Sequence, residues 1–329
     1  MNKEIKLSGF HQSAVESTIT DVQKADYNRQ RPKKDAETLC YAPYANLYFG
    51  RQGTVHCCCN NRDYVVGEYP KDSIDEIWNG SRINKLREYL VNYNLSLNCD
   101  YCQDDFNRCG YSQVPAQHFD RLELNNDRPS MMEFELDTIC NLECQMCTGE
   151  LSTAIRKNRD HLPPIKSHYD GAFVEQIKPY LPHLKETRFS GGEPFLIPIY
   201  YQIWEELTKV NPECLISVQT NGTVLNNKVK AQMEKGRFEI GVSLDSLVKE
   251  TFEDIRKNAK FETVMENVAY FSEYCKRKGT GFRLSICVMR NNWKDLPEYI
   301  NMCNRLNAYA CFHKVFNPKE LSLIYWDSE

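Results

Sequence analysis

The sequence predicts an α/β protein in which a small, cysteine-rich α+β unit precedes a sheet of parallel strands. From residue 131 onward, strand-like and helix-like runs alternate, which is typical of βαβ units with parallel strands. Residues 40–109 carry short β-type runs, helical runs and several of the chain's 15 cysteines. The length of 329 residues fits about two domains of ~100–200 residues each.

Charge and hydropathy exclude some classes of partner. The 41 Lys and Arg residues against 45 Asp and Glu give a formal net charge of −4, so no overall positive field favours nucleic acid or an anionic membrane. The first eight residues lack the apolar core of a signal peptide, and no run approaches ~18 apolar residues. We therefore expect a cytoplasmic protein with no membrane partner, in which clustered cysteines bind metal rather than form disulfides.

Residues 1–39 are polar and charged and show no sustained apolar period, so we predict a mobile N-terminal arm or a segment that depends on a partner. The arm ends in the basic run 29–35. We expect this run to be solvated, and contact with an acidic partner is the alternative.

The sequence of residues 40–109 predicts a β-hairpin followed by helices. Aromatic and β-branched residues flank Gly50 and Gly53, which predicts two short strands joined by a glycine-containing turn. Apolar residues at helical spacing then predict helices over 73–78 and 81–93, with Ser81 as the N-cap of the second.

Residues 110–130, polar and proline-containing, are the predicted connection to residues 131–329. The strand 238–244 has an apolar face, Phe238 to Leu244 in alternation, and a polar face that includes Glu239 and Ser243. Parallel strands buried on both sides are normally apolar throughout, so a polar second face predicts a wet or ligand-filled interior. The predicted strands are 131–137, 186–190, 214–220, 238–244, 282–288 and 310–316.

Cys140, Cys144 and Cys147 form a CxxxCxxC run directly after the first of these strands. Thiolates select iron–sulfur clusters or zinc, and a four-iron cluster normally takes four cysteines. Three cysteines leave one iron open to another ligand, and the spacing resembles the radical S-adenosylmethionine (SAM) family. The segments Gly191–Pro194 (GGEP), Thr220–Gly222 and Ser243–Asp245 follow in the order of that family's motifs.

This resemblance departs from the family at Met146, where an aromatic residue is usual. A zinc knuckle or ordinary buried thiols is the alternative for the three cysteines. The resemblance implies a partial, laterally open TIM-like barrel of six βα units, with its chemistry at the C-terminal ends of the strands.

The resemblance also implies contacts to SAM. The GGEP segment meets the amino group of SAM, and Glu193 orients that loop or accepts a bond from the ligand. Ser243 contacts the ribose or carboxylate, and Arg256 pairs with the carboxylate, with a surface ion pair as the alternative. The SAM-binding candidates are Gly191, Gly192, Glu193, Asn221, Ser243 and Arg256.

Residues 40–109 resemble the auxiliary-cluster domain called SPASM and its single-cluster form, Twitch. Cys40, twelve residues, Gly53, four residues and Cys58 fit the family pattern, and a CxxC pair follows. The resemblance implies a second [4Fe–4S] cluster, with the single-cluster form favoured; the family usually has this domain after the barrel, so the order here looks permuted. The implied ligands are Cys40, Cys58, Cys99 and Cys102.

The sequence leaves the roles of several further cysteines undecided. Cys57 and Cys59 flank Cys58, so the register of the ligand is uncertain by one, and Cys109 is a spare candidate. Structural zinc fits the same four thiolates locally. Five cysteines without ligand spacing are expected to be buried small hydrophobic residues: Cys214, Cys275, Cys287, Cys303 and Cys311.

The implied function is that of a radical SAM enzyme with one auxiliary cluster. One electron from the reduced first cluster cleaves SAM to methionine and a 5′-deoxyadenosyl radical, which abstracts a substrate hydrogen. The auxiliary cluster accepts the second electron of a net oxidation. A reductant such as flavodoxin or ferredoxin and a peptide or small-molecule substrate are the expected partners; a non-catalytic iron–sulfur or zinc protein is the alternative.

Overall fold

The computed structural model describes residues 19–122, 124 and 127–326. Within these residues nine strands form one sheet in the order β3-β2-β1-β4-β5-β6-β7-β8-β9. The strands are β1 Asn46–Phe49, β2 Thr54–His56, β3 Gly67–Glu68, β4 Met131–Phe134, β5 Glu186–Phe189, β6 Leu215–Thr220, β7 Arg237–Ser243, β8 Phe282–Val288 and β9 Tyr309–Lys314. All six strands predicted after residue 130 are therefore present.

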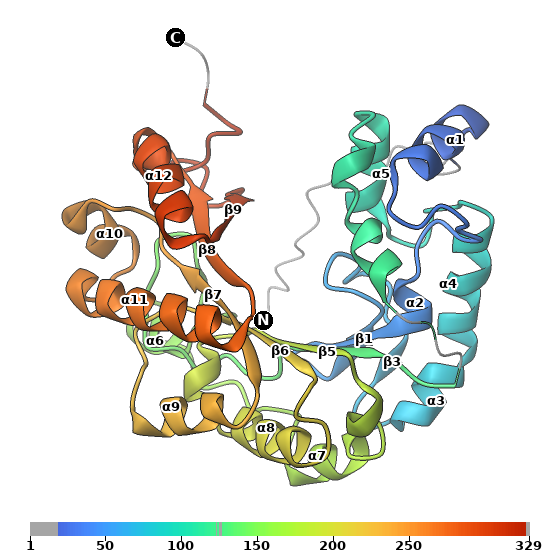
Figure 1. The fold of residues 1–329 in the computed structure, drawn as a ribbon, viewed down its shortest axis with the longest axis horizontal. Helices are drawn as coiled ribbons and strands as arrows, with labels where there is room; N and C mark the ends of the chain where they lie inside the picture. The colour runs from blue at the N-terminus through green and yellow to red at the C-terminus, as the bar shows by residue number, and fades with distance from the viewer. Residues whose placement is uncertain (1–18, 123, 125–126, 327–329) are drawn as a thin grey trace, which may run out of the picture.

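Strands β4 to β9 pair in parallel in sequence order, which confirms the predicted α/β architecture. The hairpin of the cysteine-rich unit joins the same sheet, because β1 pairs in parallel with β4 while β2 and β3 pair antiparallel. The two units thus share one continuous sheet. Figure 1 shows this sheet curving between a lobe that holds α1–α5 and a lobe that holds β8, β9 and α10–α12.

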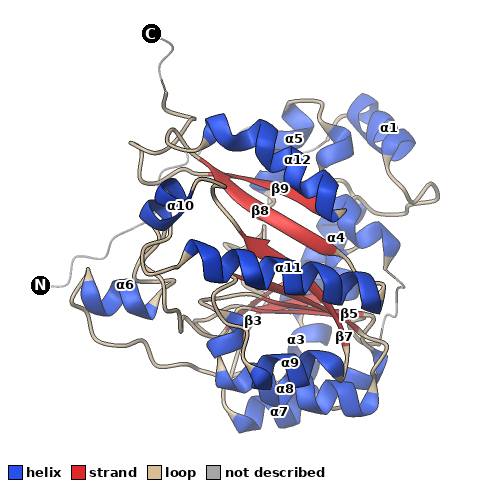
Figure 2. Ribbon diagram, turned by 60° about the vertical axis from the view of Figure 1, so that its left-hand side comes forward, coloured by secondary structure: helices blue, strands red, loops and turns tan. Residues whose placement is uncertain are grey.

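Helices cover the outer side of the curved sheet, as Figures 1 and 2 show for α7, α8, α9 and α11. The α-helices are α1 Asp21–Gln30, α2 Ala42–Ala45, α3 Ile74–Asn79, α4 Ser81–Val91, α5 Asp100–Asn107, α6 Thr153–Asn158, α7 Gly171–Ile177, α8 Pro198–Val210, α9 Asn227–Glu234, α10 Lys249–Ile255, α11 Phe261–Lys278 and α12 Leu296–Leu306. The 3₁₀ helices are η1 Tyr111–Gln113, η2 Pro115–Arg121, η3 Leu181–His183, η4 Pro194–Leu196 and η5 Trp293–Asp295. No described helix is long and apolar enough to cross a membrane.

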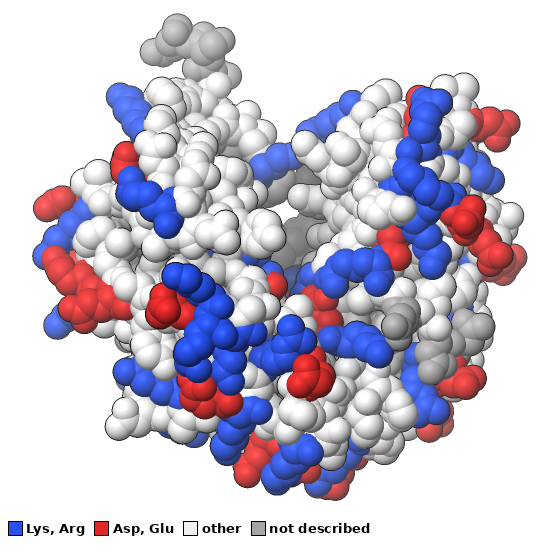
Figure 3. Space-filling view, in the orientation of Figure 1, with Lys and Arg blue, Asp and Glu red and all other residues white. Residues whose placement is uncertain are grey.

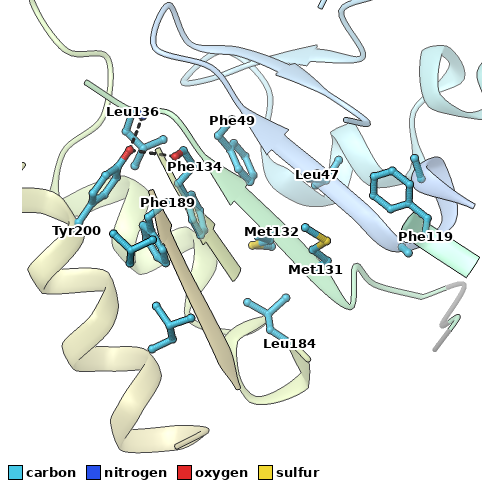
Figure 4. Packing of buried hydrophobic residues seen from close by; sticks show 14 of the residues in the cluster. Leu47, Phe49, Phe119, Met131, Met132, Phe134, Leu136, Leu184, Phe189 and Tyr200 are labelled. Carbon is cyan, nitrogen blue, oxygen red and sulfur yellow. Dashed lines mark hydrogen bonds between the residues drawn. The ribbon is translucent and has the colours of Figure 1, made fainter. Parts of the chain in front are cut away.

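The outward face of the sheet carries the core. Phe49, Phe134 and Phe189 lie on β1, β4 and β5 and stack with ring centroids 5.7 and 4.9 Å apart. Tyr200 of α8 is fully buried, and its hydroxyl accepts a hydrogen bond from the backbone N–H of Leu136 at 2.9 Å (Figure 4). This bond fixes α8 against the segment that leads from β4 to the cysteine loop.

The inward face is polar, as the alternation in 238–244 predicts. Phe238, Ile240 and Val242 are fully buried, whereas Glu239 and Ser243 on the same strand are partly exposed. Figure 3 shows the hollow that this face forms between the two lobes.

The cap predicted for the second helix of the small unit is wrong by one residue. Gly80 is both the C-cap of α3 and the N-cap of α4, and Ser81 is the first helical residue. A Cβ at Gly80 would lie 2.6 Å from the carbonyl oxygen of Glu76, so the tight junction of the two helices requires glycine there. Ser73 caps α3 instead, in a capping box with Glu76.

The prediction of a mobile arm is wrong for residues 19–39, and residues 1–18 lie outside the described part. Helix α1 packs on the small unit, with Tyr27 fully buried and its hydroxyl donating to the carbonyl of Leu39. Arg31, predicted to be solvated, is also fully buried and pairs with Asp120 of η2. The predicted connection 110–130 therefore holds two 3₁₀ helices that pack on the small unit.

Candidate functional site

Cys140, Cys144 and Cys147 lie on the loop between β4 and α6. The side-chain hydroxyl of Thr153 accepts from the Cys140 N–H and donates to its carbonyl, each at 3.1 Å. The backbone N–H of Gln145 donates to the carbonyl of Ile255 at 2.9 Å, which ties the loop to the end of α10. The loop is thus held on both sides, so its three thiols have defined positions.

Two nitrogen donors lie beside these thiols. Arg256 Nη1 is 3.8 Å from Cys144 Sγ, and Asn221 Nδ2 is 3.9 Å from Cys140 Sγ. Burial raises the pKa of all three thiols, in the case of Cys144 to about 12, and the Arg256 guanidinium opposes that rise. Metal ligation requires thiolates, and both donors stabilise negative charge on sulfur.

The glycines of the GGEP segment meet protein backbone. A Cβ at Gly191, whose φ is +108°, would lie 2.6 Å from the carbonyl oxygen of Asp137. A Cβ at Gly192 would lie 2.2 Å from the carbonyl oxygen of Ile139. The segment therefore needs glycine in order to pack against the start of the cysteine loop, and its contact with SAM stays a prediction.

Glu193 orients this loop, as one of the two predicted roles requires. Its carboxylate accepts hydrogen bonds from the Thr220 hydroxyl and the Asn221 N–H, each at 2.7 Å, and from the Phe195 N–H at 3.1 Å. The side chain is fully buried, and burial raises its pKa to about 7 against these three donors. Glu193 thereby joins the GGEP segment to the end of β6.

Arg256 is a buried residue, so the alternative of a surface ion pair is wrong. Its Nε lies 2.8 Å from Oδ2 of Asp245, whose side chain has no exposed surface. The other oxygen, Oδ1, accepts from the backbone N–H of Cys287 at 2.7 Å. Asn292 Nδ2 then bridges the carbonyls of Asp245 and Cys287 at 2.7 and 2.9 Å. These bonds join the ends of β7 and β8 to the cysteine loop through Arg256.

Ser243 lies at the C-terminal end of β7 on the inward face. Its hydroxyl accepts from Gln219 Nε2 at 2.9 Å, and Ser285 of β8, its partner in register, donates to Gln219 Oε1 at 3.4 Å. The predicted contact of Ser243 with SAM stays a prediction.

Two residues of this region have roles that the sequence reading missed. Asp245 was quoted only as part of a motif, and Cys287 was expected to be a buried small hydrophobic residue. Cys287 is only partly buried, and its backbone N–H binds Oδ1 of Asp245. The signal was available, because Cys287 follows Arg283 and Ser285 on the polar face of its strand.

The four auxiliary-cluster candidates lie together in the small unit. Together with Cys57, they line a mainly apolar cavity of about 30 Å³ between α4, η2 and the hairpin. Protein interiors contain few voids larger than a water molecule, so a cavity lined by sulfur fits a bound inorganic group. The four thiols are Cys40, Cys58, Cys99 and Cys102.

Nitrogen donors also reach these sulfurs. The backbone N–H of Ala42 donates to Cys40 Sγ at 3.4 Å, and Asn61 Nδ2 donates to Cys99 Sγ at 3.3 Å. Asn61 is almost fully buried, and the same amide group bonds the carbonyl of Leu97 at 3.0 Å. N–H···S bonds of this kind stabilise cluster thiolates and tune their potential.

The structure argues against one of the two cysteines that flank Cys58 as the auxiliary ligand. Cys59 does not line the cavity and faces Glu133, Arg188 and Arg62 on the inward side of the sheet. Cys57 does line the cavity beside Cys58, so it remains an alternative ligand. Among the described residues, no three or more His, Cys, Asp or Glu side chains are placed so that they could hold a single metal ion.

The sequence model of the radical SAM superfamily matches residues 135–303, just over half of the chain. The chain belongs to the radical SAM superfamily. The model of an iron–sulfur cluster-binding domain, SPASM, matches residues 40–104, which precede the radical SAM region. Radical SAM proteins are enzymes that use SAM and a [4Fe–4S] cluster, and the SPASM match implies a further cluster.

Similar curated proteins are GTP 3′,8-cyclases. The enzyme of Synechocystis is 29% identical over 143 residues, 40% of this chain and 42% of that protein. The enzyme of Limosilactobacillus fermentum is 25% identical over 192 residues, 58% of this chain and 55% of that protein. The chain thus covers about half of the length of these relatives.

Among solved structures, native anSMEcpe with bound AdoMet is 20% identical, with a TM-score of 0.44 over 57% of this chain and 52% of that one. Streptococcus suis SuiB bound to S-adenosylmethionine is 15% identical, with a TM-score of 0.44 over 75% of this chain and 55% of that one.

Both sets of thiols fit the clusters that the family implies. Each set combines three or four soft ligands with nitrogen donors to sulfur, and the second set surrounds a cavity. The zinc alternative for the small unit has less support than iron, because the matching domain is described as iron–sulfur.

Proposed function

We propose that this radical SAM protein is an oxidoreductase that cleaves SAM at a cluster held by Cys140, Cys144 and Cys147. The 5′-deoxyadenosyl radical so supplied oxidises an organic substrate by two electrons. The observation that carries the proposal is the fastening of the three-cysteine loop to the ends of β6, β7 and β8 through Glu193, Asp245 and Arg256.

The residues at these strand ends would hold SAM. Arg256 already binds Asp245 through Nε and lies beside Cys144 through Nη1, which leaves guanidinium N–H groups for a carboxylate. Ser243 offers a hydroxyl on the inward face. Gly191, Gly192 and Asn221 place backbone and amide groups beside Cys140 and the segment that precedes it.

The small unit would hold the second cluster through Cys40, Cys58, Cys99 and Cys102. Four thiolates close a four-iron cluster completely, so its role is to accept an electron rather than to bind substrate. Burial of the site and the Asn61 bond to Cys99 suit a group that exchanges electrons without ligand exchange.

The partners remain a reductant of flavodoxin or ferredoxin type and a peptide or small-molecule substrate. The curated relatives act, by name, on GTP, and a nucleotide substrate is therefore a second candidate for this chain. A two-electron oxidation consumes SAM, so the proposal excludes an isomerisation in which SAM is regenerated.

Anaerobic reconstitution followed by dithionite and SAM tests the proposal. We expect 5′-deoxyadenosine from the wild-type chain and none from a variant with Cys140, Cys144 and Cys147 replaced by Ala. Deoxyadenosine from the triple variant would show that the cluster assignment is wrong, and none from the wild type would favour the non-catalytic alternative. With a substrate in hand, one deoxyadenosine per product and the loss of two hydrogens are expected.

A further inference from the structure

A row of polar and charged side chains crosses the inward face of the sheet. Tyr48, Glu133, Arg188, Ser217 and Glu239 stand in register on β1, β4, β5, β6 and β7. Adjacent strands lie ~4.8 Å apart, so the row extends over five strands of continuous surface. None of these side chains has a part in the proposed cleavage of SAM.

Two further arginines complete the row at its ends. The guanidinium of Arg62 lies over the Tyr48 ring, 5.0 Å from its centroid. Arg283 of β8 is in register with Gly241 of β7, and its Nη2 donates to the hydroxyl of Ser217, the residue in register with Arg188, at 2.8 Å. We call Arg62, Arg188 and Arg283 the arginine row.

The carboxylates that pair with the arginine row lie beneath it. The side chains of Glu133, Glu135 and Glu186 are 6%, 7% and 3% exposed, and that of Glu239 is 18% exposed. Those of Arg62, Arg188 and Arg283 are 49%, 31% and 24% exposed. The buried carboxylates fix the guanidinium groups, and the positive groups face the hollow. Figure 3 shows Lys and Arg side chains, interspersed with acidic ones, on the surface around this hollow.

Arg62 and Arg283 keep donors that no described protein group uses, whereas Arg188 engages Nε with Glu186, Nη1 with Glu133 and Nη2 with His118. A guanidinium carries five N–H groups. Arg62 donates from Nε to the Cys59 carbonyl and from Nη2 to Glu135, each at 2.9 Å, and its Nη1 is not engaged. Arg283 engages Nη1 with Glu239 and Nη2 with Ser217, and its Nε is not engaged.

We propose that the arginine row binds an anionic group of the substrate, a phosphate or a carboxylate. Guanidinium groups match the geometry of both anions, and arginines already fixed by buried carboxylates lose little entropy on binding. This inference rests on the proposed function only for the statement that the bound molecule is the substrate.

The position of the row suits a molecule that is processed between the clusters. Arg62 binds the carbonyl of Cys59, the residue after the auxiliary ligand Cys58. Arg283 lies on the same strand as Cys287, whose backbone N–H binds Asp245, the partner of Arg256. An anion on the row therefore anchors a substrate whose remaining atoms extend toward the strand ends.

Isothermal titration of the reconstituted full chain under anaerobic conditions tests the row, with pyrophosphate in one arm and succinate in the other. We expect saturable binding of at least one anion that weakens with added salt and weakens at least tenfold in Arg62→Met. Arg283→Gln serves as a second variant and is expected to weaken binding in the same way. Tighter binding of pyrophosphate identifies a phosphate-bearing substrate, and tighter binding of succinate a carboxylate.

Arg305→Met is the matched control, because Arg305 forms an exposed pair with Glu298 on α12, and its binding should equal that of the wild type. No saturable binding of either anion, or equal binding by Arg62→Met, Arg283→Gln and Arg305→Met, would overturn the proposal. Wild-type deoxyadenosine formation without substrate is measured separately. If no deoxyadenosine forms but the anion still binds, the proposed function is wrong. If deoxyadenosine forms but no anion binds, the proposal for the arginine row is wrong.

Discussion

Asp245 joins three parts of the site through one side chain that has no exposed surface. It binds Arg256 through Oδ2 and the Cys287 N–H through Oδ1, while its own carbonyl accepts from Asn292. Because Arg256 also lies beside Cys144, loss of the Asp245 charge affects both the fold of the strand ends and the cysteine loop.

We therefore expect Asp245→Asn to lower the free energy of unfolding by about 3–5 kcal/mol, the usual cost of breaking a buried ion pair by removal of one partner. Deoxyadenosine formation should fall at least tenfold. Glu298→Gln, which breaks the exposed pair with Arg305, should change stability by less than ~1 kcal/mol. Equal stability of the two variants in anaerobic urea unfolding would contradict this role.

His118 is held neutral between two arginines. Burial, followed by Arg188 and Arg121, lowers its pKa to about 3. Its Nε2 lies 2.9 Å from Arg121 Nη2 and accepts from Arg188 as well, which requires the unprotonated ring. The unfolded chain binds a proton at His118 near pH 6.5, whereas the folded chain does not until about pH 3.

The stability that depends on neutral His118 is complete above pH 6.5 and is lost as the pH falls toward 3. Between pH 7.5 and 5.5 the wild type should lose about 1.4 kcal/mol more than His118→Gln, whose amide oxygen accepts the same bonds without titrating. Unfolding at the two pH values measures this difference. Identical losses in the two proteins would show that His118 does not titrate on unfolding.

At the scale of elements, α1 is the part that the sequence reading predicted worst. Apolar periodicity predicts a helix only where several apolar residues face a core, and α1 has one, Tyr27. Its contacts come instead from Arg31, which binds Asp120 and the carbonyl of Thr38. A usable signal was Thr20 with Gln23, which form a capping box.

Asp120→Asn should lower the free energy of unfolding by about 3–5 kcal/mol, because it leaves the fully buried Arg31 without its counter-charge. Asp26→Asn is the control, since its partner Arg29 is exposed, and a change below ~1 kcal/mol is expected. Urea unfolding of both variants makes the comparison. A small effect of Asp120→Asn would mean that α1 contributes little to the small unit.

The strands were predictable because each alternates or runs apolar by itself. Phe238 to Leu244 predicted both the buried face and the polar face of β7 without knowledge of its neighbours. The pairing of β1 with β4 was not predictable, because it joins residues 85 apart that carry no local signal of partnership. Alternation places Cys287 on the polar face of β8, whereas its bond to Asp245 carries no local signal.

At the scale of the whole molecule, the shared sheet places the two cysteine sites relative to each other. The small unit precedes the radical SAM region in the chain, and β1 nevertheless lies directly beside β4, whose end leads to Cys140. The inward face of the same sheet carries the arginine row.

The central claim is that two separate cysteine sets hold two clusters, and iron per chain after full reconstitution tests it most directly. We expect about eight irons in the wild type and about four in a variant with Cys140, Cys144 and Cys147 replaced by Ala. A variant with Cys40, Cys58, Cys99 and Cys102 replaced by Ala should also keep about four. Near-zero iron in the first variant, with zinc bound in its place, would contradict the account.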